Sequence, residues 1–153
     1  MKILVVCYGN VCRSPLAEYL LREKAKERRL ELEVTSSGLC SPEELGFHSI
    51  HPLGKLILST LGIDTSRHKP RLTTKAMVDE SDLVLIMDRR VVMHLKQRGL
   101  YGKNCELFLA FSEHPHKTSL EDPIGGTLED FKVCAREIGQ AADRILKKLY
   151  PQE

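Results

Sequence analysis

A cysteine and an arginine near the start of the chain have a spacing that suits phosphate chemistry. Cys7 follows the apolar run of residues 3–6, whose length and β-branching predict a buried strand. Arg13 comes six positions later, just before Pro15 and an amphipathic segment. We predict a tight strand-to-helix loop whose backbone N–H groups turn inward and bind an anion. The Arg13 guanidinium can hold two oxygens of a phosphate at once.

The reaction that this loop predicts is attack by the Cys7 sulfur on a phosphoryl group. The positive end of the following helix dipole would strengthen anion binding and favour thiolate over thiol. The spacing alone is a weak motif because it occurs often by chance. The context strengthens it, since the loop follows a predicted strand, contains Gly9 and Asn10, and ends at a helix start. None of the other four cysteines has an arginine six residues on.

With these residues the chain resembles the low-molecular-weight protein tyrosine phosphatases. Their signature is similar to residues 6–15 together with Ala17 and Glu18. Further similarities follow in the same order along nearly all of the chain: Ser36-Ser37-Gly38, His68 with Arg71-Leu72, Asp82 to Leu85 with Met87-Asp88, and Asp122-Pro123. The resemblance implies a cysteine-dependent phosphatase that acts on phosphotyrosine in proteins and needs no cofactor and no metal.

The resemblance also implies catalytic roles. Cys7 is the nucleophile, Arg13 binds the phosphate, and Asp122 is a general acid that later activates water to hydrolyse the cysteinyl-phosphate. Without the resemblance, Asp122-Pro123 followed by two glycines indicates only a loop before a helix. The phosphate-binding loop is predicted to comprise Cys7, Tyr8, Gly9, Asn10, Val11, Cys12 and Arg13.

Supporting roles are implied for three polar residues and a second thiol. In the family the residue matching Asn10 holds the loop in shape, the one matching Ser14 hydrogen-bonds the sulfur, and His68 supports both. Taken alone, they are a turn former, a helix cap and a solvated histidine. Cys12 is either a small buried hydrophobe or a resolving thiol that captures oxidised Cys7 as a disulfide, and the resemblance favours the second. The remaining cysteines are predicted to be packing residues: Cys40, Cys105 and Cys134.

Residues near the predicted loop bear on the choice of substrate. Ile124 follows Asp-Pro where tyrosine phosphatases often have a tyrosine, and Phe47 is the only aromatic residue in 39–50, so Tyr8 is a candidate for the missing ring. Protein arginine phosphatases share the fold and the Gly-Gly after Asp-Pro, but carry at the position of Val11 a threonine that orients the attacking water. We therefore predict phosphotyrosine, with phosphoarginine as the alternative.

Two other functions are disfavoured. Thioredoxin-linked arsenate reductases share the loop but need two further cysteines after the third strand, and residues 83–99 contain none. A non-catalytic phosphate-binding or redox-sensing module would not require Cys7, Arg13 and Asp122 together. The pair His114 and His116 has possible metal spacing, but no matching cluster supports a metal site.

The elements that position these residues are predicted from alternating strand-like and helix-like patterns. Strands are expected at 2–6, about 32–36, 83–87 and about 105–109, and helices at 15–29, 51–61, 73–79 and 89–98. Apolar residues three and four apart from Leu128 to Leu149 predict the last helix, for which a coiled-coil dimer is the alternative to packing on the sheet. Ser14 and Thr127 are the expected caps of the first and last helices. We predict one α/β domain, residues 1–153, with an open parallel Rossmann-like or flavodoxin-like sheet of about four strands, helices on both faces, and the phosphate loop after the first strand.

Composition limits the partners and the compartment. The chain has 23 basic and 21 acidic residues, which implies no strong attraction to nucleic acid or membrane, and the basic segment 67–71 is expected to be a solvated loop. No apolar run reaches membrane-spanning length, and the start lacks the apolar stretch of a secretion signal. An odd count of five cysteines without a scaffold pattern fits a reducing compartment. We therefore expect a cytoplasmic monomer that acts on phosphorylated proteins.

Overall fold

The computed structural model describes residues 1–112 and 120–151, which build a four-stranded parallel sheet with the strand order β2-β1-β3-β4. The strands are β1 (Lys2–Cys7), β2 (Glu33–Gly38), β3 (Leu83–Ile86) and β4 (Cys105–Leu107). Cys7 is paired with Gly38, and Val6 with Ile86. The carboxyl ends of β1, β2 and β3 therefore meet at one edge of the sheet, where open α/β sheets bind their ligands.

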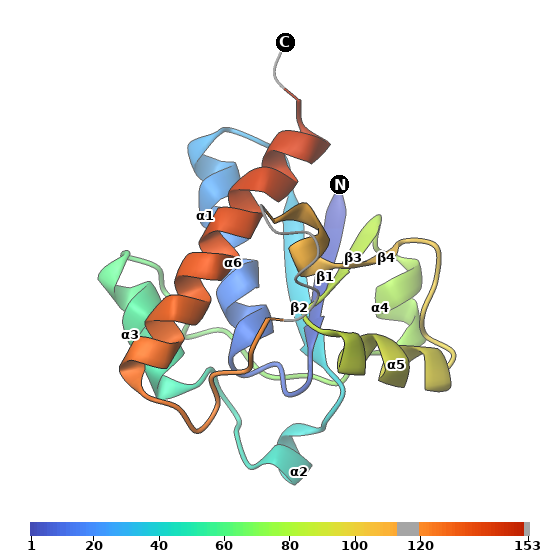
Figure 1. The fold of residues 1–153 in the computed structure, drawn as a ribbon, viewed down its shortest axis with the longest axis horizontal. Helices are drawn as coiled ribbons and strands as arrows, with labels where there is room; N and C mark the ends of the chain where they lie inside the picture. The colour runs from blue at the N-terminus through green and yellow to red at the C-terminus, as the bar shows by residue number, and fades with distance from the viewer. Residues whose placement is uncertain (113–119, 152–153) are drawn as a thin grey trace.

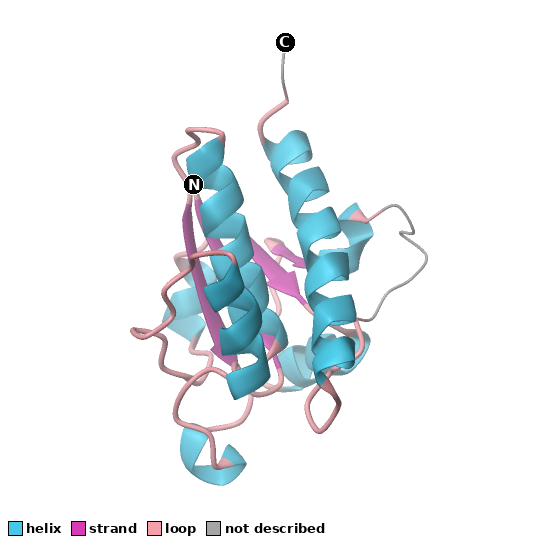
Figure 2. Ribbon diagram, turned by 90° about the vertical axis from the view of Figure 1, so that its left-hand side faces the viewer, coloured by secondary structure: helices cyan, strands magenta, loops and turns pink. Residues whose placement is uncertain are grey.

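Helices cover both faces of this sheet (Figure 1). They are α1 (Arg13–Glu27), α2 (Pro42–Leu45), α3 (Pro52–Thr60), α4 (Lys75–Asp79), α5 (Arg89–Gln97) and α6 (Leu128–Leu149). The two long helices, α1 and α6, run side by side (Figure 2). The predicted fold class, an open parallel α/β sheet between helices, is confirmed.

The period-2 alternation of β1 sends its side chains into two of the three buried apolar clusters of the described structure. Ile3, Val5 and Cys7 pack with residues of α1 and α6 on one face. Leu4 and Val6 pack with residues of α4 and α5 on the other. Both sets are almost fully buried, as expected for a central parallel strand.

The last helix packs against α1 and does not require a coiled-coil partner to bury its apolar face. Phe131, Ile138, Ala142 and Ile145 are fully buried within the described structure. Thr127 caps the helix, and the Thr127 and Asp130 side chains form a reciprocal capping box. The predicted cap of α6 is thus confirmed.

Two predictions are wrong, and one element was missed. β4 ends at Leu107, and Phe108–Phe111 form a 3-10 turn that buries three of its four residues, which a strand would have divided between two faces. The short helix α2 was not predicted, although Ser41 caps it and Pro42 opens it. Ser14 is not the cap of α1, because the helix begins at Arg13 and the Ser14 hydroxyl is used inside the catalytic loop.

No helix in the described part of the chain is long and apolar enough to cross a membrane.

Candidate active site

Cys7 is the last residue of β1, and its sulfur lies beneath the loop that leads into α1. The residue is 2% exposed, and its Sγ accepts the backbone N–H of Asn10 at 3.2 Å. The Ser14 hydroxyl lies 3.0 Å from the same sulfur. Because Ser14 Oγ already accepts from the Asn10 amide at 2.9 Å, its own proton is free to point at Cys7. The sulfur is thus surrounded by donors, an arrangement that suits a thiolate.

The carbonyl groups of the loop point away from the sulfur. Tyr8 O accepts from the N–H groups of Leu39 and Cys40, and Val11 O accepts from the N–H of His51. Asn10 O is bonded by the His68 ring at 2.9 Å. With these carbonyls turned outward, the amides of the loop are left to face its interior. This geometry supports the predicted anion-binding nest.

Asn10 holds the loop in an uncommon backbone conformation. Its φ is +57°, a left-handed value that asparagine tolerates better than most residues. The side chain donates to Ser14 and to Ser36, and its Oδ1 accepts the Arg71 N–H at 3.1 Å. With His68 on its carbonyl, this fully buried residue has partners on three separate segments: α1, β2 and the loop of residues 68–71. The predicted supporting residues Asn10, Ser14 and His68 therefore lie together.

The end of β2 lies directly against the loop. A Cβ atom at Gly38 would come within 2.9 Å of Asn10 N, so only glycine fits this close approach. Ser36 donates to the buried carboxylate of Glu18, which in turn pairs with Arg22 at 2.8 Å. Glu18 and Arg22 of α1 thus hold Ser36 in place, and Ser36 in turn holds the Asn10 side chain.

The Arg13 guanidinium is anchored along one edge and open along the other. Its Nη1 donates to Asp88 Oδ2 at 2.6 Å and to Leu120 O at 2.8 Å. Its Nε, in contrast, is buried and has no hydrogen-bond partner among the described residues. Burial alone would lower the pKa of Arg13, but the facing groups Cys7, Asp122 and Asp88 outweigh it and raise that pKa above its usual value. A buried, permanently charged guanidinium with an unsatisfied Nε–H is suited to an oxyanion.

Asp122 reaches the same guanidinium from the loop before α6. Its Oδ2 lies 3.5 Å from Arg13 Nη2, and its Oδ1 accepts the Ile124 N–H at 3.1 Å. The side chain remains about one-third exposed, so it can move between Arg13 and a bound substrate. The structure therefore brings Cys7, Arg13 and Asp122 to one place.

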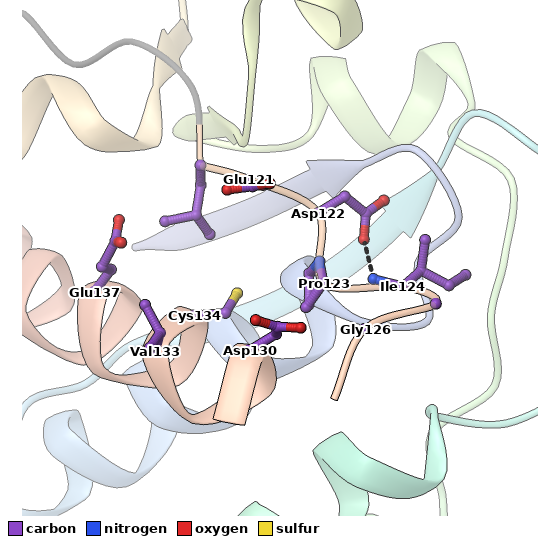
Figure 3. Close-up of a pocket in the computed structure, with 11 residues that line it drawn as sticks. Glu121, Asp122, Pro123, Ile124, Gly126, Asp130, Val133, Cys134 and Glu137 are labelled. Atoms are coloured by element: carbon purple, nitrogen blue, oxygen red, sulfur yellow. Dashed lines mark hydrogen bonds between the residues drawn. The ribbon is translucent and has the colours of Figure 1, made fainter. Parts of the chain in front are cut away.

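A cavity of about 690 Å³ lies between this loop and α6 (Figure 3). Asp122, Ile124, Val133 and Cys134 are among its lining residues, whereas Cys7 and Arg13 are not. The cavity thus borders the loop that carries Asp122, on a side that does not contain the nucleophile. It gives the loop room to shift.

Two further thiols lie near Cys7. Cys12 is 4% exposed, and burial, followed by the charges of Asp122 and Cys7, raises its pKa above the usual range. Burial likewise raises the pKa of Cys134, on α6, to about 12. All five cysteines are free and buried. Whether Cys12 is the redox partner of Cys7 stays a prediction.

An apolar wall flanks the loop on the side of Val11. Val11 is buried against Cys12 and Phe131, and the His51 ring stacks on Phe131 with a centroid distance of 4.6 Å. The Val11 side chain thus belongs to a packed cluster. The Phe47 ring belongs to the same stack, with a centroid distance of 5.6 Å to the His51 ring.

Two side chains at this rim remain available to a substrate. Tyr8 and Ile124 are 47% and 40% exposed. Leu45 of α2 also covers the loop, because a Cβ atom at Gly9 would lie only 2.5 Å from Leu45 Cδ2. All three residues therefore lie close to the catalytic residues: Tyr8 in the loop itself, Ile124 two positions after Asp122, and Leu45 against Gly9.

Sequence reasoning missed two residues of this site. Asp88 orients Arg13, and its position two residues after the end of β3, at the same sheet edge as Cys7, was the available signal. Leu45 was missed because α2 was not predicted.

Metal binding finds no support in the described residues, where no group of three histidine, cysteine or carboxylate side chains could hold an ion. The pair His114 and His116 lies outside the described residues.

Comparison with known proteins agrees with this geometry. A family model for low molecular weight phosphotyrosine protein phosphatases matches residues 2–153. The chain belongs to this family. It is therefore a cysteine-dependent phosphatase whose relatives act on phosphorylated proteins.

Individual relatives include both kinds of protein phosphatase that the sequence suggested. The phosphatase is 32% identical to the low molecular weight phosphotyrosine protein phosphatase of Sus scrofa over 151 residues, which cover 96% of this chain and 94% of that one. It is 28% identical to the protein-arginine-phosphatase of Bacillus subtilis (strain 168), with 97% of each chain covered. Among solved structures, the low molecular weight protein tyrosine phosphatase of T. tengcongensis superposes with a TM-score of 0.87 at 31% identity, covering 97% of this chain and 99% of that chain.

Proposed function

We propose that this phosphatase hydrolyses phosphotyrosine in proteins through a phosphocysteine formed on Cys7. The observation that carries the proposal is the open edge of Arg13. Its Nη1 is held by Asp88 and Leu120, which leaves the buried Nε, without a partner among the described residues, beside the sulfur loop. A phosphoryl group bound by this edge and by the loop amides would rest against Cys7 Sγ.

In the first step the Cys7 thiolate attacks phosphorus and the bond to the leaving oxygen breaks. Charge develops on the equatorial oxygens, which the loop amides and Arg13 stabilise. The leaving oxygen takes a proton from the Asp122 carboxyl group. The products of this step are the free phenol and a phosphocysteine.

In the second step water attacks the phosphorus of the phosphocysteine. The Asp122 carboxylate, left after the first step, takes the proton of this water. The sulfur–phosphorus bond breaks, and inorganic phosphate and the Cys7 thiolate are regenerated. The Ser14 hydroxyl, 3.0 Å from the sulfur, stabilises the departing thiolate. No metal or cofactor takes part in these steps.

Substrate choice is proposed from two residues of the loop. Tyr8, 47% exposed and adjacent to the nucleophile, is the aromatic side chain most available to a phosphotyrosine ring. The side chain at position 11 is an apolar valine in a buried cluster, so it has no hydroxyl to direct water toward a phosphoarginine. Both observations favour phosphotyrosine. We also propose that the protein acts in the cytoplasm as a monomer, without nucleic acid or membrane as a partner.

The test is a direct comparison of turnover on matched phosphotyrosine and phosphoarginine peptides. We expect a higher kcat/KM for phosphotyrosine, with a high KM because Ile124 provides no aromatic wall. An aromatic pair contributes about 0.5–1.5 kcal/mol, so Ile124→Tyr should lower KM for phosphotyrosine by up to roughly tenfold with little change in kcat.

Val11→Thr is the matching variant for the alternative substrate. It should raise activity on phosphoarginine, since it introduces the threonine hydroxyl that protein arginine phosphatases carry at this position. A native preference for phosphoarginine would instead establish the protein arginine phosphatase activity of the Bacillus subtilis relative.

A further inference from the structure

A second groove lies beside the catalytic loop, among α1, the end of β2 and residues 67–71. Its volume is about 430 Å³. The residues that matter here, which we call the basic groove, are Glu18, Arg22, Arg67, His68, Lys69 and Arg71. All the residues that line it belong to the described structure.

The basic groove concentrates positive charge. Four cationic side chains and one carboxylate line it, a net charge of +3, whereas the whole chain carries only +2. Three of these cations belong to residues 67–71, which the sequence predicted to be a solvated loop. A concave site where cations outnumber carboxylates four to one raises the local concentration of anions.

Two of the cations are fixed and two are free. Arg22 pairs with Glu18 and donates to Val34 O, while Arg71 Nε donates to Ser36 O at 3.0 Å. Arg67 and Lys69 are exposed and make no hydrogen bond or ion pair within the described structure. The charge of Arg67 helps to lower the pKa of Asp64, whose carboxylate accepts the Ser66 N–H and forms no ion pair with Arg67 within the described structure. The groove thus has an ordered wall and two unpaired charges.

His68 connects the groove to the catalytic loop. The residue is 8% exposed, and its Nε2 donates to Asn10 O at 2.9 Å, since a carbonyl can only accept. Its Nδ1 has no hydrogen-bond partner among the described residues. A ligand in the groove that reaches Nδ1 would therefore be one imidazole ring away from the backbone of Asn10.

We propose that the basic groove is a second anion site that binds a phosphate dianion. Arg67 and Lys69 supply the free charges, Arg71 the fixed wall, and His68 the contact with the catalytic loop. Guanidinium groups match the geometry of phosphate oxygens. Nucleic acid is a poor fit because the two aromatic rings that line the groove, those of Tyr19 and His68, pack edge to face on each other, and Arg22 covers the Tyr19 ring. The dianion is either free phosphate, the product of the reaction, or a phosphoryl group on a protein side chain.

Nuclear magnetic resonance titration with inorganic phosphate tests the proposal without relying on turnover. The Gly9 amide reports the catalytic loop, and the Lys69 amide and the His68 Nδ1 resonance report the groove. We expect two independent saturation curves. Arg67→Glu with Lys69→Glu should weaken the groove curve by about tenfold or more, because two attractive charges become repulsive. The Gly9 curve should be unchanged in this variant.

The control variant is Lys103→Glu with Lys147→Glu, which changes the net charge equally at exposed positions outside the groove. It should leave both curves intact. Arg67→Lys with Lys69→Arg keeps the charges and should retain binding. If the charge-reversed variant does not fold, Arg67→Ala and Lys69→Ala each remove one cation, and each should weaken the groove curve alone.

A phosphoserine hexapeptide distinguishes the two sources of the dianion. Tighter binding of the peptide than of inorganic phosphate identifies a protein-borne phosphoryl group, and equal binding identifies free phosphate. The proposal is overturned if Lys69 and His68 follow the Gly9 curve in every variant, or if they do not respond to either probe.

Discussion

Arg13 divides its hydrogen bonds between structure and chemistry. One edge is used by Asp88 and Leu120, which hold the guanidinium plane. The other edge includes the buried Nε without a partner among the described residues and the Nη2 that faces Asp122. Such a buried donor is costly unless a ligand satisfies it. The residue is therefore held ready for an oxyanion at the expense of folding stability.

Asp122→Ala tests the proton donor. The variant should slow the hydrolysis of aryl phosphates with poor leaving groups by roughly 10²–10⁴-fold, because general acid catalysis contributes a rate enhancement of that size. Substrates whose leaving groups need no proton should be much less affected. The measurement is kcat across a series of leaving-group pKa values. A uniform loss across the series would show that Asp122 is not the donor.

Cys12→Ser tests the resolving thiol. Mild peroxide should oxidise Cys7 to a sulfenic acid, which the Cys12 thiol converts to a disulfide with loss of water, and a dithiol should restore activity. Because burial raises the pKa of Cys12, disulfide formation should be faster at higher pH. In Cys12→Ser the same exposure should cause loss that a dithiol cannot reverse.

Cys134→Ser is the matched control, since Cys134 is another buried thiol near the loop whose pKa is raised to about 12. It should stay recoverable. Mass spectrometry that finds Cys12 free in oxidised but recoverable protein would contradict the mechanism.

At the scale of elements, the start of α3 links helix capping to the active site. His51 Nδ1 accepts the Leu53 N–H at 3.2 Å, and its ring stacks between Phe47 and Phe131. Its backbone N–H also holds the carbonyl of Val11. One residue therefore caps a helix and fixes the catalytic loop.

His51→Asn should reduce the loss of folding stability that accompanies a fall in pH. Burial lowers the pKa of His51 below its usual 6.5, although Asp122 acts in the opposite direction. As pH falls, the unfolded chain therefore takes up this proton first. The stabilising contribution is present in full above pH 6.5 and is lost as pH falls below it.

Asparagine keeps a capping acceptor but does not titrate, so Tm should fall less between pH 7 and pH 5 than in the native protein. The control is His48→Asn, at an exposed histidine three positions away. Equal declines in the native protein and in His51→Asn would argue against this assignment.

The elements differ in how far the sequence predicts them. β1 and α6 were predictable because one is a short β-branched run and the other has a long helical period with the Thr127–Asp130 capping box. The end of β4 was not, since apolar runs do not reveal whether side chains alternate or lie on one face of a turn. Ser14 resembled a cap in the sequence, but the need to satisfy Asn10 and Cys7 outweighed capping. Leu45 reaches the site only through a tertiary contact, which local patterns do not record. Asp88 could be placed at the sheet edge from its position after β3, but its pairing with Arg13 depends on the strand order.

At the scale of the whole molecule, the parallel sheet assembles the site from distant parts of the chain. Asp88 is 75 positions from Arg13, yet the two side chains meet because β1 and β3 are neighbours and end at the same edge. Gly38 and Ser36 reach Asn10 because β2 flanks β1 on the other side. The central strand thus carries the nucleophile, and its neighbours carry the residues that shape the loop.

The most direct test of the proposed mechanism is to trap the phosphoryl group on the enzyme. The native protein is mixed with a phosphotyrosine peptide, quenched within the first turnover, digested and analysed by mass spectrometry. We predict one added phosphoryl group on the peptide that contains Cys7, and neither turnover nor phosphocysteine in Cys7→Ser. Full turnover by Cys7→Ser, or a phosphoryl group found only on another residue of the native protein, would contradict the assignment of Cys7 as the nucleophile.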